Sequence, residues 1–235
     1  MIFGGQPKVE FTCSPELHGV IPEPVPARTY IPDWFKNLKQ YTKDFMELTE
    51  GEFSGKTAKR CPPILDTLTT GWIIPLQTTV TVKTNHDCSW FQWAQSRMPA
   101  FEAHGTEQIN GHPMLPRPPI KALNHWHIKT PPGWSTLFVA PLNRDNDIFQ
   151  AIPGIVDTDK FTENINFPGF FVKPDMNEDL KAGFPVVQAI PFKRGMDKKA
   201  IVRSRTEKEE AIMLKKNNKY GNVQGLYRDK WWVKK

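Results

Sequence analysis

Short apolar runs separated by proline, glycine and Asn/Asp clusters dominate the middle of the chain. Between His127 and Arg194, β-branched and aromatic residues repeatedly alternate with such turn-forming clusters. This spacing is typical of consecutive antiparallel strands joined by tight turns. We therefore expect a mainly β fold, an antiparallel barrel or sandwich over residues 70–193, with two or three peripheral α-helices.

Upstream of this region the pattern predicts three more strands and one long loop. Residues 72–82 and 88–93 read as strands joined by a turn near residues 85–87, and residues 123–129 as a further strand. Residues 97–119 are rich in proline, histidine and glycine without clear periodicity. A segment of this kind and length is often functional.

Apolar residues at alternating steps of four and three predict an amphipathic helix over residues 33–48. Asp33 is placed to cap it, and its apolar stripe comprises Trp34, Leu38, Tyr41, Phe45 and Leu48. The helix either packs on the β-rich core or presents this stripe to a partner, since a projecting aromatic stripe requires cover.

Two further helices are expected. One begins at Cys61, because proline is tolerated in the first turn, and ends at Gly71. The other spans residues 205–218, where Thr206 with Glu209, and Ser204 with Glu207, form capping boxes. Acidic residues in the first turn and lysines further on suit the helix dipole.

Composition divides the chain into three parts. Residues 1–32 form a proline-rich arm, residues 33–195 a single β-rich domain with N-terminal helices, and residues 196–235 a basic helical extension. From Lys193 to Lys235 there are 14 Lys/Arg and 5 Asp/Glu, so this tail carries +9 while the remainder carries −3. A basic tail suits an anionic partner, although a solvated tail explains it equally well.

No apolar run is long enough for a membrane helix, and the N-terminus lacks the pattern of a secretory signal. Cys13, Cys61 and Cys88 are scattered without zinc-ligand spacing, which fits a reducing compartment. We therefore expect an intracellular protein without membrane attachment.

Two segments resemble trimeric dUTPases. Residues 154–159, Gly-Ile-Val-Asp-Thr-Asp, with Phe161 after them, are similar to the Gly-Val-Ile-Asp-x-Asp-Tyr segment of those enzymes, and residues 183–190 are similar to their later Gly-Asp-Arg-Ile-Ala-Gln-Leu-Ile strand. This resemblance implies a β-clip fold. It also implies a water-positioning role for Asp157 and a ligand site that includes Asn143, Arg144, Asp159 and Gln188.

The dUTPase phosphate-binding elements are absent from this sequence. Residues 141–144, Pro-Leu-Asn-Arg, stand where those enzymes have Pro-Arg-Ser-Gly, and the C-terminal region offers only Gly221 and Gly225 as a phosphate loop. A degenerate nucleotide-binding protein is the version of this hypothesis that remains. Asp157 and Asp159 can instead cap a turn between strands.

A closer resemblance covers residues 60–195. Gly71-Trp72-Ile73-Ile74, Pro132-Gly133-Trp134, Pro141-Leu142-Asn143 and the 154–159 segment are similar to the motifs of a bacterial and phage family of unknown function. That resemblance implies a phage protein, located in the host cytoplasm or in a virion, but it implies no activity.

Histidines supply an alternative chemistry. If residues 123–129 form a strand, His125 and His127 share one face, as in cupin-type metal sites, with His104 as a candidate third ligand. The Glu that normally follows in a cupin is replaced by Thr130-Pro131-Pro132. We expect no cofactor, and keep a divalent metal with a small-ligand or metal-dependent enzyme as the alternative.

Two tryptophans close the chain. Trp231 and Trp232 lie among Arg228, Lys230 and Lys234, and leaving two indoles in water forgoes a large apolar burial. We expect them to dock on the parent domain or on a neighbouring subunit. Without a complete catalytic set of residues, the sequence favours a non-catalytic binding or assembly protein that self-associates or binds a protein partner.

Overall fold

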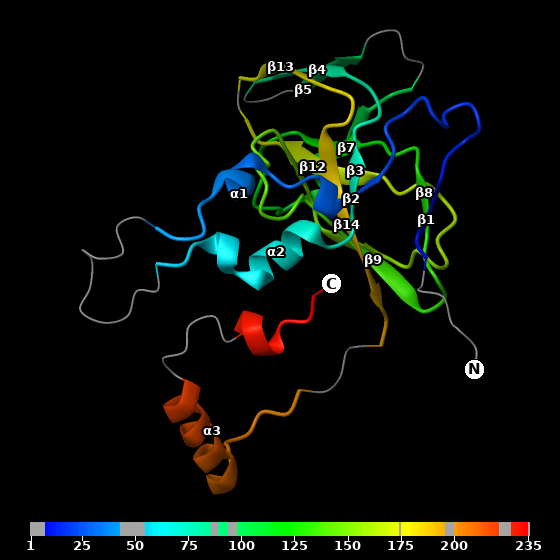
Figure 1. The fold of residues 1–235 in the computed structure, drawn as a ribbon. Helices are drawn as coiled ribbons and strands as arrows, with labels where there is room; N and C mark the ends of the chain where they lie inside the picture. The colour runs from blue at the N-terminus through cyan, green and yellow to red at the C-terminus, as the bar shows by residue number, and fades with distance from the viewer. Residues whose placement is uncertain are drawn as a thin grey trace. The chain divides into compact units, whose positions relative to one another are not determined.

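The protein is mainly β, which confirms the fold class predicted from the apolar pattern. A computed structural model describes residues 8–42, 55–85, 89–93, 98–173, 175–195, 200–220 and 227–234. In these residues 14 strands form four antiparallel sheets (Figure 1). The chain divides into a large unit, Met1–Tyr30 with Thr69–Arg194, and a small unit, Ile31–Leu68 with Gly195–Lys235. The predicted division into arm, domain and extension stays a prediction.

The widest sheet of the large unit has five strands. Its order is β11 (Gly154–Val156), β9 (Trp134–Val139), β14 (Pro185–Lys193), β3 (Trp72–Pro75) and β2 (Val25–Pro26). All pairings are antiparallel, and β14 lies at the centre between β9 and β3. The consecutive residues Val186 to Ala189 of β14 are all buried, and because side chains alternate between the two faces of a sheet, both faces are covered here.

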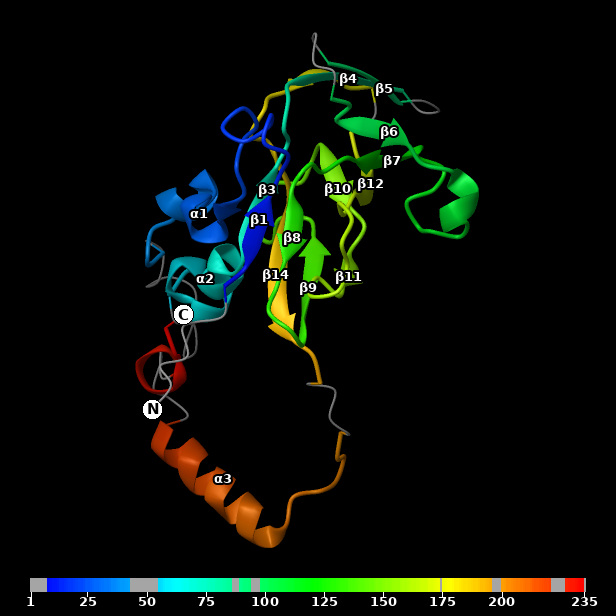
Figure 2. The same cartoon turned by 90° about the vertical axis from the view of Figure 1, so that its right-hand side faces the viewer.

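Three smaller sheets complete the large unit. The four-stranded sheet is β10 (Phe149–Ala151), β12 (Phe167–Phe171), β7 (Pro119–Ala122) and β6 (Phe101–Ala103). The three-stranded sheet is β13 (Asn177–Leu180), β4 (Val80–Thr84) and β5 (Ser89–Trp93). From the N-terminal segment, β1 (Glu10–Thr12) pairs with β8 (His127–Lys129), as Figure 2 shows.

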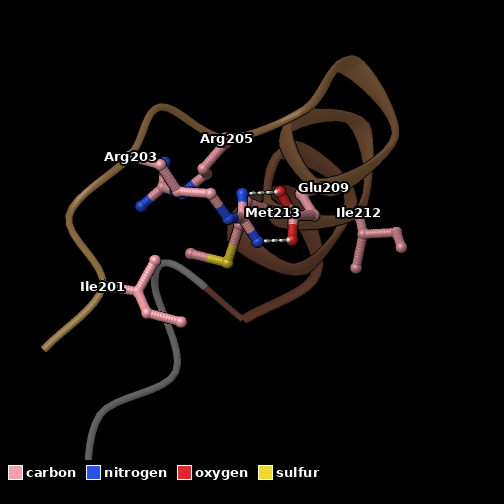
Figure 3. Close-up of a pocket in the computed structure, with 6 residues that line it drawn as sticks. All are labelled: Ile201, Arg203, Arg205, Glu209, Ile212 and Met213. Carbon is pink, nitrogen blue, oxygen red and sulfur yellow. Dashed lines mark hydrogen bonds and ion pairs between the residues drawn. The ribbon is translucent and has the colours of Figure 1, made fainter. Parts of the chain in front are cut away.

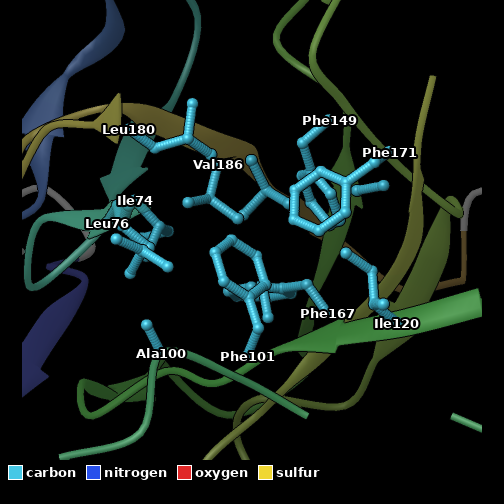
Figure 4. Packing of buried hydrophobic residues seen from close by; sticks show 14 of the residues in the cluster. Ile74, Leu76, Ala100, Phe101, Ile120, Phe149, Phe167, Phe171, Leu180 and Val186 are labelled. Carbon is cyan, nitrogen blue, oxygen red and sulfur yellow. The ribbon is translucent and has the colours of Figure 1, made fainter. Parts of the chain in front are cut away.

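The hydrophobic core lies between these sheets. The ring of Phe101 lies 5.8 Å from that of Phe149 and 5.2 Å from that of Phe171, and all three side chains are buried. They face aliphatic side chains of the five-stranded sheet, including Ile74 and Val186 (Figure 4). Full burial of one such side chain contributes about 1.5–3 kcal/mol, so this cluster is the main source of stability in the large unit.

The described α-helices belong to the small unit, apart from the last residue of α2, and it also contains two shorter helical turns. They are α1 (Asp33–Asn37), the 3-10 turn η2 (Ala58–Arg60), α2 (Pro62–Thr69), α3 (Glu207–Tyr220) and the short helix η4 (Tyr227–Trp231). The predictions of α2 and α3 are confirmed. Thr206 and Glu209 form the expected capping box, since the Glu209 amide donates to Thr206 Oγ1 and the Thr206 amide donates to the Glu209 carboxylate.

The prediction of one helix over residues 33–48 is wrong for its described part. The helix ends at Asn37, Leu38 is extended, and Pro32 rather than Asp33 is the N-cap. The amide of Thr42 donates to the Gly55 carbonyl, and the amide of Thr57 to the Gln40 carbonyl. Residues 40–42 thus pair with a distant segment instead of continuing the helix. Residues 43–48 lie outside the described residues.

The strand predicted over residues 72–82 is two strands in different sheets. The chain leaves β3 after Pro75, where the Leu76 amide donates to the Phe184 carbonyl, and it enters β4 at Val80. The loop predicted over residues 97–119 is also wrong in part, because it contains β6 and a 3-10 turn, η3 (Thr106–Ile109).

The strand predicted over residues 123–129 is regular only in its last part. The side chain of Asn124 accepts from the Trp126 amide at 3.0 Å and donates to the Trp126 carbonyl at 2.8 Å. These two bonds hold the backbone in a local turn, as asparagine commonly does. The strand begins only at His127, so His125 and His127 do not share the face of one regular strand.

Candidate interaction surface

The five residues predicted to bind a ligand fall into two separate groups along β14. Gln188 is paired with Val139, whereas Lys193 is paired with Trp134, near Asp157 and Asp159. Five residues of strand separate these positions, which is about 17 Å. One small ligand therefore does not contact both groups.

In the first group, Asn143, Arg144 and Gln188, the side chains of Arg144 and Gln188 bond mainly to backbone groups. The fully buried Gln188 side chain accepts from the Leu142 amide at 3.0 Å and from Arg144 Nη1 at 3.2 Å, and donates to the Thr70 carbonyl at 2.7 Å. Arg144 also donates to the carbonyls of Tyr30 and Ala27, and burial lowers its pKa. Asn143 occupies the left-handed region with φ 53°. Together these hydrogen bonds connect the N-terminal segment and the turn at Leu142 to β14.

The second group centres on an ion pair that the sequence did not reveal. Asp159 Oδ1 accepts from Arg194 Nη1 at 2.7 Å, and Asp159 Oδ2 accepts from the Gly133 amide at 2.8 Å. The hydrogen bond from Arg194 is the main reason that the pKa of Asp159 falls from 3.8 to about 2, and the same pair raises the pKa of Arg194. Arg194 is 35 residues from Asp159, so only folding brings them together.

Asp157, the residue given a water-positioning role by resemblance, is half-exposed and has two polar neighbours. Ser135 Oγ donates to its Oδ1 at 2.6 Å, and Arg194 Nη1 lies 3.3 Å from the same oxygen. Between the two aspartates, the buried Thr158 hydroxyl bonds with those of Thr130 and Thr136. These contacts close the turn after β11 onto β9, as expected of aspartates that cap a turn. The implied water-positioning role stays a prediction.

The histidines proposed as alternative metal ligands have different surroundings. His127 Nε2 lies 3.4 Å from the Phe161 carbonyl oxygen. The Nε2 atom of His125 is buried and has no hydrogen-bond partner among the described residues. The His104 backbone amide donates to the Pro119 carbonyl. Within the described ranges, no three His, Cys, Asp or Glu side chains are placed to hold one metal ion.

Aromatic side chains of the small unit are unusually exposed. Trp34 is 45% exposed, Tyr41 51% and Trp231 59%, whereas Leu38 is half-buried. These four residues and Trp232 are the set that the sequence predicts as an interaction surface. Large exposed aromatics are typical of partner-binding surfaces, where they supply much of the binding energy.

The fifth member of that set, Trp232, is anchored inside the small unit. Its indole Nε1 lies 3.2 Å from both carboxylate oxygens of Asp66, a buried residue of α2. A small cavity of about 70 Å³ adjoins it, lined in part by Leu65 and Arg228. Trp232 therefore holds the C-terminal tail while its neighbour Trp231 points into solvent.

A larger hollow of about 540 Å³ lies between α3 and the segment before it (Figure 3). Ile201, Ile212 and Met213 line it with apolar surface, and Arg203, Arg205 and Glu209 with charge. Arg203 donates two hydrogen bonds of 2.7 Å to the Glu209 carboxylate. This pairing is the largest cause of the fall in the pKa of Glu209 from 4.5 to about 2.

The helix that forms one wall of this hollow has no buried face. From Glu207 to Lys219 only Glu209 and Met213 are half-buried, and every other side chain is exposed. In the preceding segment Ile201 is 84% exposed and Val202 96%. A helix of 14 residues is marginal by itself in water, so the cap of α3 contributes much of its stability.

Charge also distinguishes the two units. The small unit contains 18 Lys/Arg and 11 Asp/Glu, a net charge of +7, and the large unit has a net charge of −1.

No helix among the described residues has the length and apolar character to cross a membrane. No family model matches the chain, and neither does any curated protein.

Proposed function

We propose that this chain is a non-catalytic binding or assembly protein whose small unit carries the contact surface. The single observation behind this proposal is the exposure of Trp34, Tyr41 and Trp231 in a unit whose C-terminal tail is itself anchored by Trp232. Burial of both indole rings would stabilise the tail further, and contact with a partner accounts for the exposed ring of Trp231. The family resemblance suggests a phage protein, acting in the virion or in the host cytoplasm.

The large unit acts in this proposal as a rigid scaffold. The side chains of Gln188, Arg144 and Asp159, which the sequence predicts as ligand contacts, form hydrogen bonds that connect loops to β14 and to its C-terminal end. Such contacts keep the β-rich unit rigid, which supports a role in presenting the small unit rather than in turnover. The aromatic surface and the basic charge of the small unit then account for self-association or partner binding.

Light scattering on the full chain tests the assembly form of this function. We expect a solution mass above the 27.0 kDa of one chain, and a lower mass for the double variant Trp34→Ala/Trp231→Ala. Trp90→Ala is the matched control, because Trp90 is equally exposed but lies in the large unit. A monomeric full chain, together with a truncation of residues 227–235 that stays equally soluble and stable, would show that the tail plays no part in assembly.

A further inference from the structure

We infer that the large unit binds a saccharide on the solvent-facing side of its three-stranded sheet, β13-β4-β5. This site goes beyond the proposed function, which concerns the small unit. Six side chains in two cross-strand rows define the site, here called the saccharide platform. They are Trp90, Lys83 and Asn177 in the first row, and Gln92, Thr81 and Asp179 in the second.

The burial of β4 separates the two faces of this sheet. Val80 and Val82 are fully buried in the core, whereas Thr81 is half-buried and Lys83 is exposed. Side chains alternate along a strand, and directly paired residues share a face. The partners of Thr81 and Lys83 therefore lie on the solvent side, and Trp90, paired with Lys83, is 54% exposed.

The platform is flat and small. Neighbouring strands lie about 4.8 Å apart and residues two apart on a strand about 6.8 Å, so the two rows cover about 7 by 10 Å. The sheet offers one open face rather than an enclosed cavity. Such a face suits one side of a sugar ring that belongs to a longer chain.

The exposed indole of Trp90 supplies the apolar contact. The face of an indole ring is electron-rich, and the C–H groups on the face of a pyranose ring carry a small positive charge. Stacking of the two faces removes apolar surface from water on both sides. A saccharide therefore accounts for a large aromatic side chain that the fold leaves exposed.

The polar side chains beside the indole match sugar hydroxyl groups, which both donate and accept hydrogen bonds. Gln92 and Asn177 each offer two donors and one acceptor oxygen, and Lys83 offers three donors. Among the residues that the structure describes, these three side chains form no hydrogen bond or ion pair. A few polar groups around an apolar contact are the usual composition of a small-ligand site.

The carboxylate of Asp179 is held in place as a further acceptor. Thr81 Oγ1 donates to its Oδ1 at 2.7 Å, and Lys181 Nζ donates to its Oδ2 at 3.2 Å. The bond from Thr81 is the main reason that the pKa of Asp179 is lowered. Lys83 and Lys181 against Asp179 leave one excess positive charge, which is too little for a nucleic acid, whose phosphates require a row of cations.

Binding of the full chain to a printed array of plant, bacterial and animal glycans tests the inference. We expect retention on at least one glycan class, and calorimetry with a soluble oligosaccharide of that class then gives the affinity. Trp90→Ala should weaken binding about tenfold or more, whereas Phe161→Ala should change it less than about twofold. Phe161 is the matched control, because it is 42% exposed and lies in the same unit.

A second pair of variants removes polar contacts and leaves the indole in place. Gln92→Ala/Asn177→Ala should weaken binding at least about fivefold, since each lost hydrogen bond costs about 0.5–1.5 kcal/mol. Asn110→Ala/Gln150→Ala removes the same two amides at exposed positions outside this sheet and should leave the affinity unchanged. Circular dichroism of each variant separates lost binding from lost folding, and if Trp90→Ala is unfolded the amide pair decides.

Two outcomes would overturn the inference: no retention of the wild type by any glycan, or equal affinities for each variant and its control. Binding of dye-labelled poly-dT that depends on Trp90, without glycan binding, would assign the platform to a nucleic acid instead. The solution mass is an independent measurement. A negative array leaves the proposed assembly function standing, and a monomeric protein leaves the saccharide platform standing.

Discussion

At the scale of single residues, two of the side chains that the sequence predicts as ligand contacts form hydrogen bonds within the chain. The polar atoms of Gln188 and Arg144 bond to backbone groups of distant segments, and their contact with a ligand stays a prediction. The sequence shows that polar residues lie in an apolar run, but it does not show what they meet. A buried polar group needs a partner, and here that partner is the chain itself.

The role of Gln188 as a buried hub leads to the first prediction. Gln188→Leu keeps the size of the side chain but leaves the Thr70 carbonyl and the Leu142 amide without their partner. A fully buried unsatisfied group costs about 1–3 kcal/mol, and because Thr70 and Leu142 are only half-buried we expect the free energy of unfolding to fall by about 2–4 kcal/mol. Urea unfolding followed by circular dichroism measures it. Gln150→Leu, on an exposed position of β10, should change it by less than about 0.5 kcal/mol.

The ion pair between Asp159 and Arg194 predicts an acid-sensitive contribution to stability. The pKa of Asp159 is about 2 in the folded protein against an ordinary 3.8, so the ionised carboxylate stabilises the fold. Its contribution is complete above about pH 4 and disappears as the pH falls through about 2.

The test compares unfolding midpoints of the wild type and Asp159→Asn from pH 6 to pH 2. We expect the variant to be less stable at pH 6 and the gap to close steadily below pH 4. The pKa of Glu209 is also low, at about 2, so Glu209→Gln separates its effect on α3 from that of Asp159. A gap that stays constant down to pH 2 would contradict the assignment.

At the scale of elements, the sequence predicted those features whose cause is local. The cap at Thr206, the prolines that open α2 and the alternating strands of the large unit all depend on neighbours in the sequence. The missed features have distant causes. Residues 40–42 left the predicted helix because they pair with residues 55–57, and the partner of Asp159 lies 35 residues away. Local patterns contain no information about such pairings, which form only when the chain folds.

Gly71 shows how one residue joins two elements. It follows α2 with φ 73°, and a Cβ atom at this position would lie 2.0 Å from the carbonyl oxygen of Ala189 in β14. Gly71→Ala must therefore displace backbone as well as strain its own conformation. We expect a loss of at least about 3 kcal/mol, at the upper end of overpacking costs, and a fall in Tm of about 6–12 °C.

Thermal unfolding of Gly71→Ala beside Gly154→Ala provides the measurement. Gly154 has an ordinary φ, and a Cβ atom there would meet no atom within 4 Å, so the control should unfold within about 2 °C of the wild type. Equal Tm values for the two variants would show that the α2–β3 turn relaxes without cost.

At the scale of the whole molecule, the chain forms two compact units of different composition. The large unit carries the phenylalanine core and almost no net charge, whereas the small unit carries a charge of +7 and the exposed aromatics. The small unit is built from two chain segments far apart in sequence, Ile31–Leu68 and Gly195–Lys235. The hydrogen bond from Trp232 to Asp66 connects these segments, so it stabilises the unit that we propose to bind.

The adjacent tryptophans of the tail therefore predict opposite effects. Trp232→Phe keeps an aromatic ring but removes the N–H that donates to the Asp66 carboxylate, which costs about 1.5–3 kcal/mol for a hydrogen bond to a charged group. We expect faster hydrogen exchange in residues 62–69 and 227–234, with the exchange of β14 unchanged. Trp231→Ala should leave exchange unchanged and weaken partner binding instead, because its ring is exposed. Hydrogen exchange and binding measured on both variants form one experiment. Equal exchange in the two variants would contradict the anchoring role of Trp232, and equal affinity would contradict the contact role of Trp231.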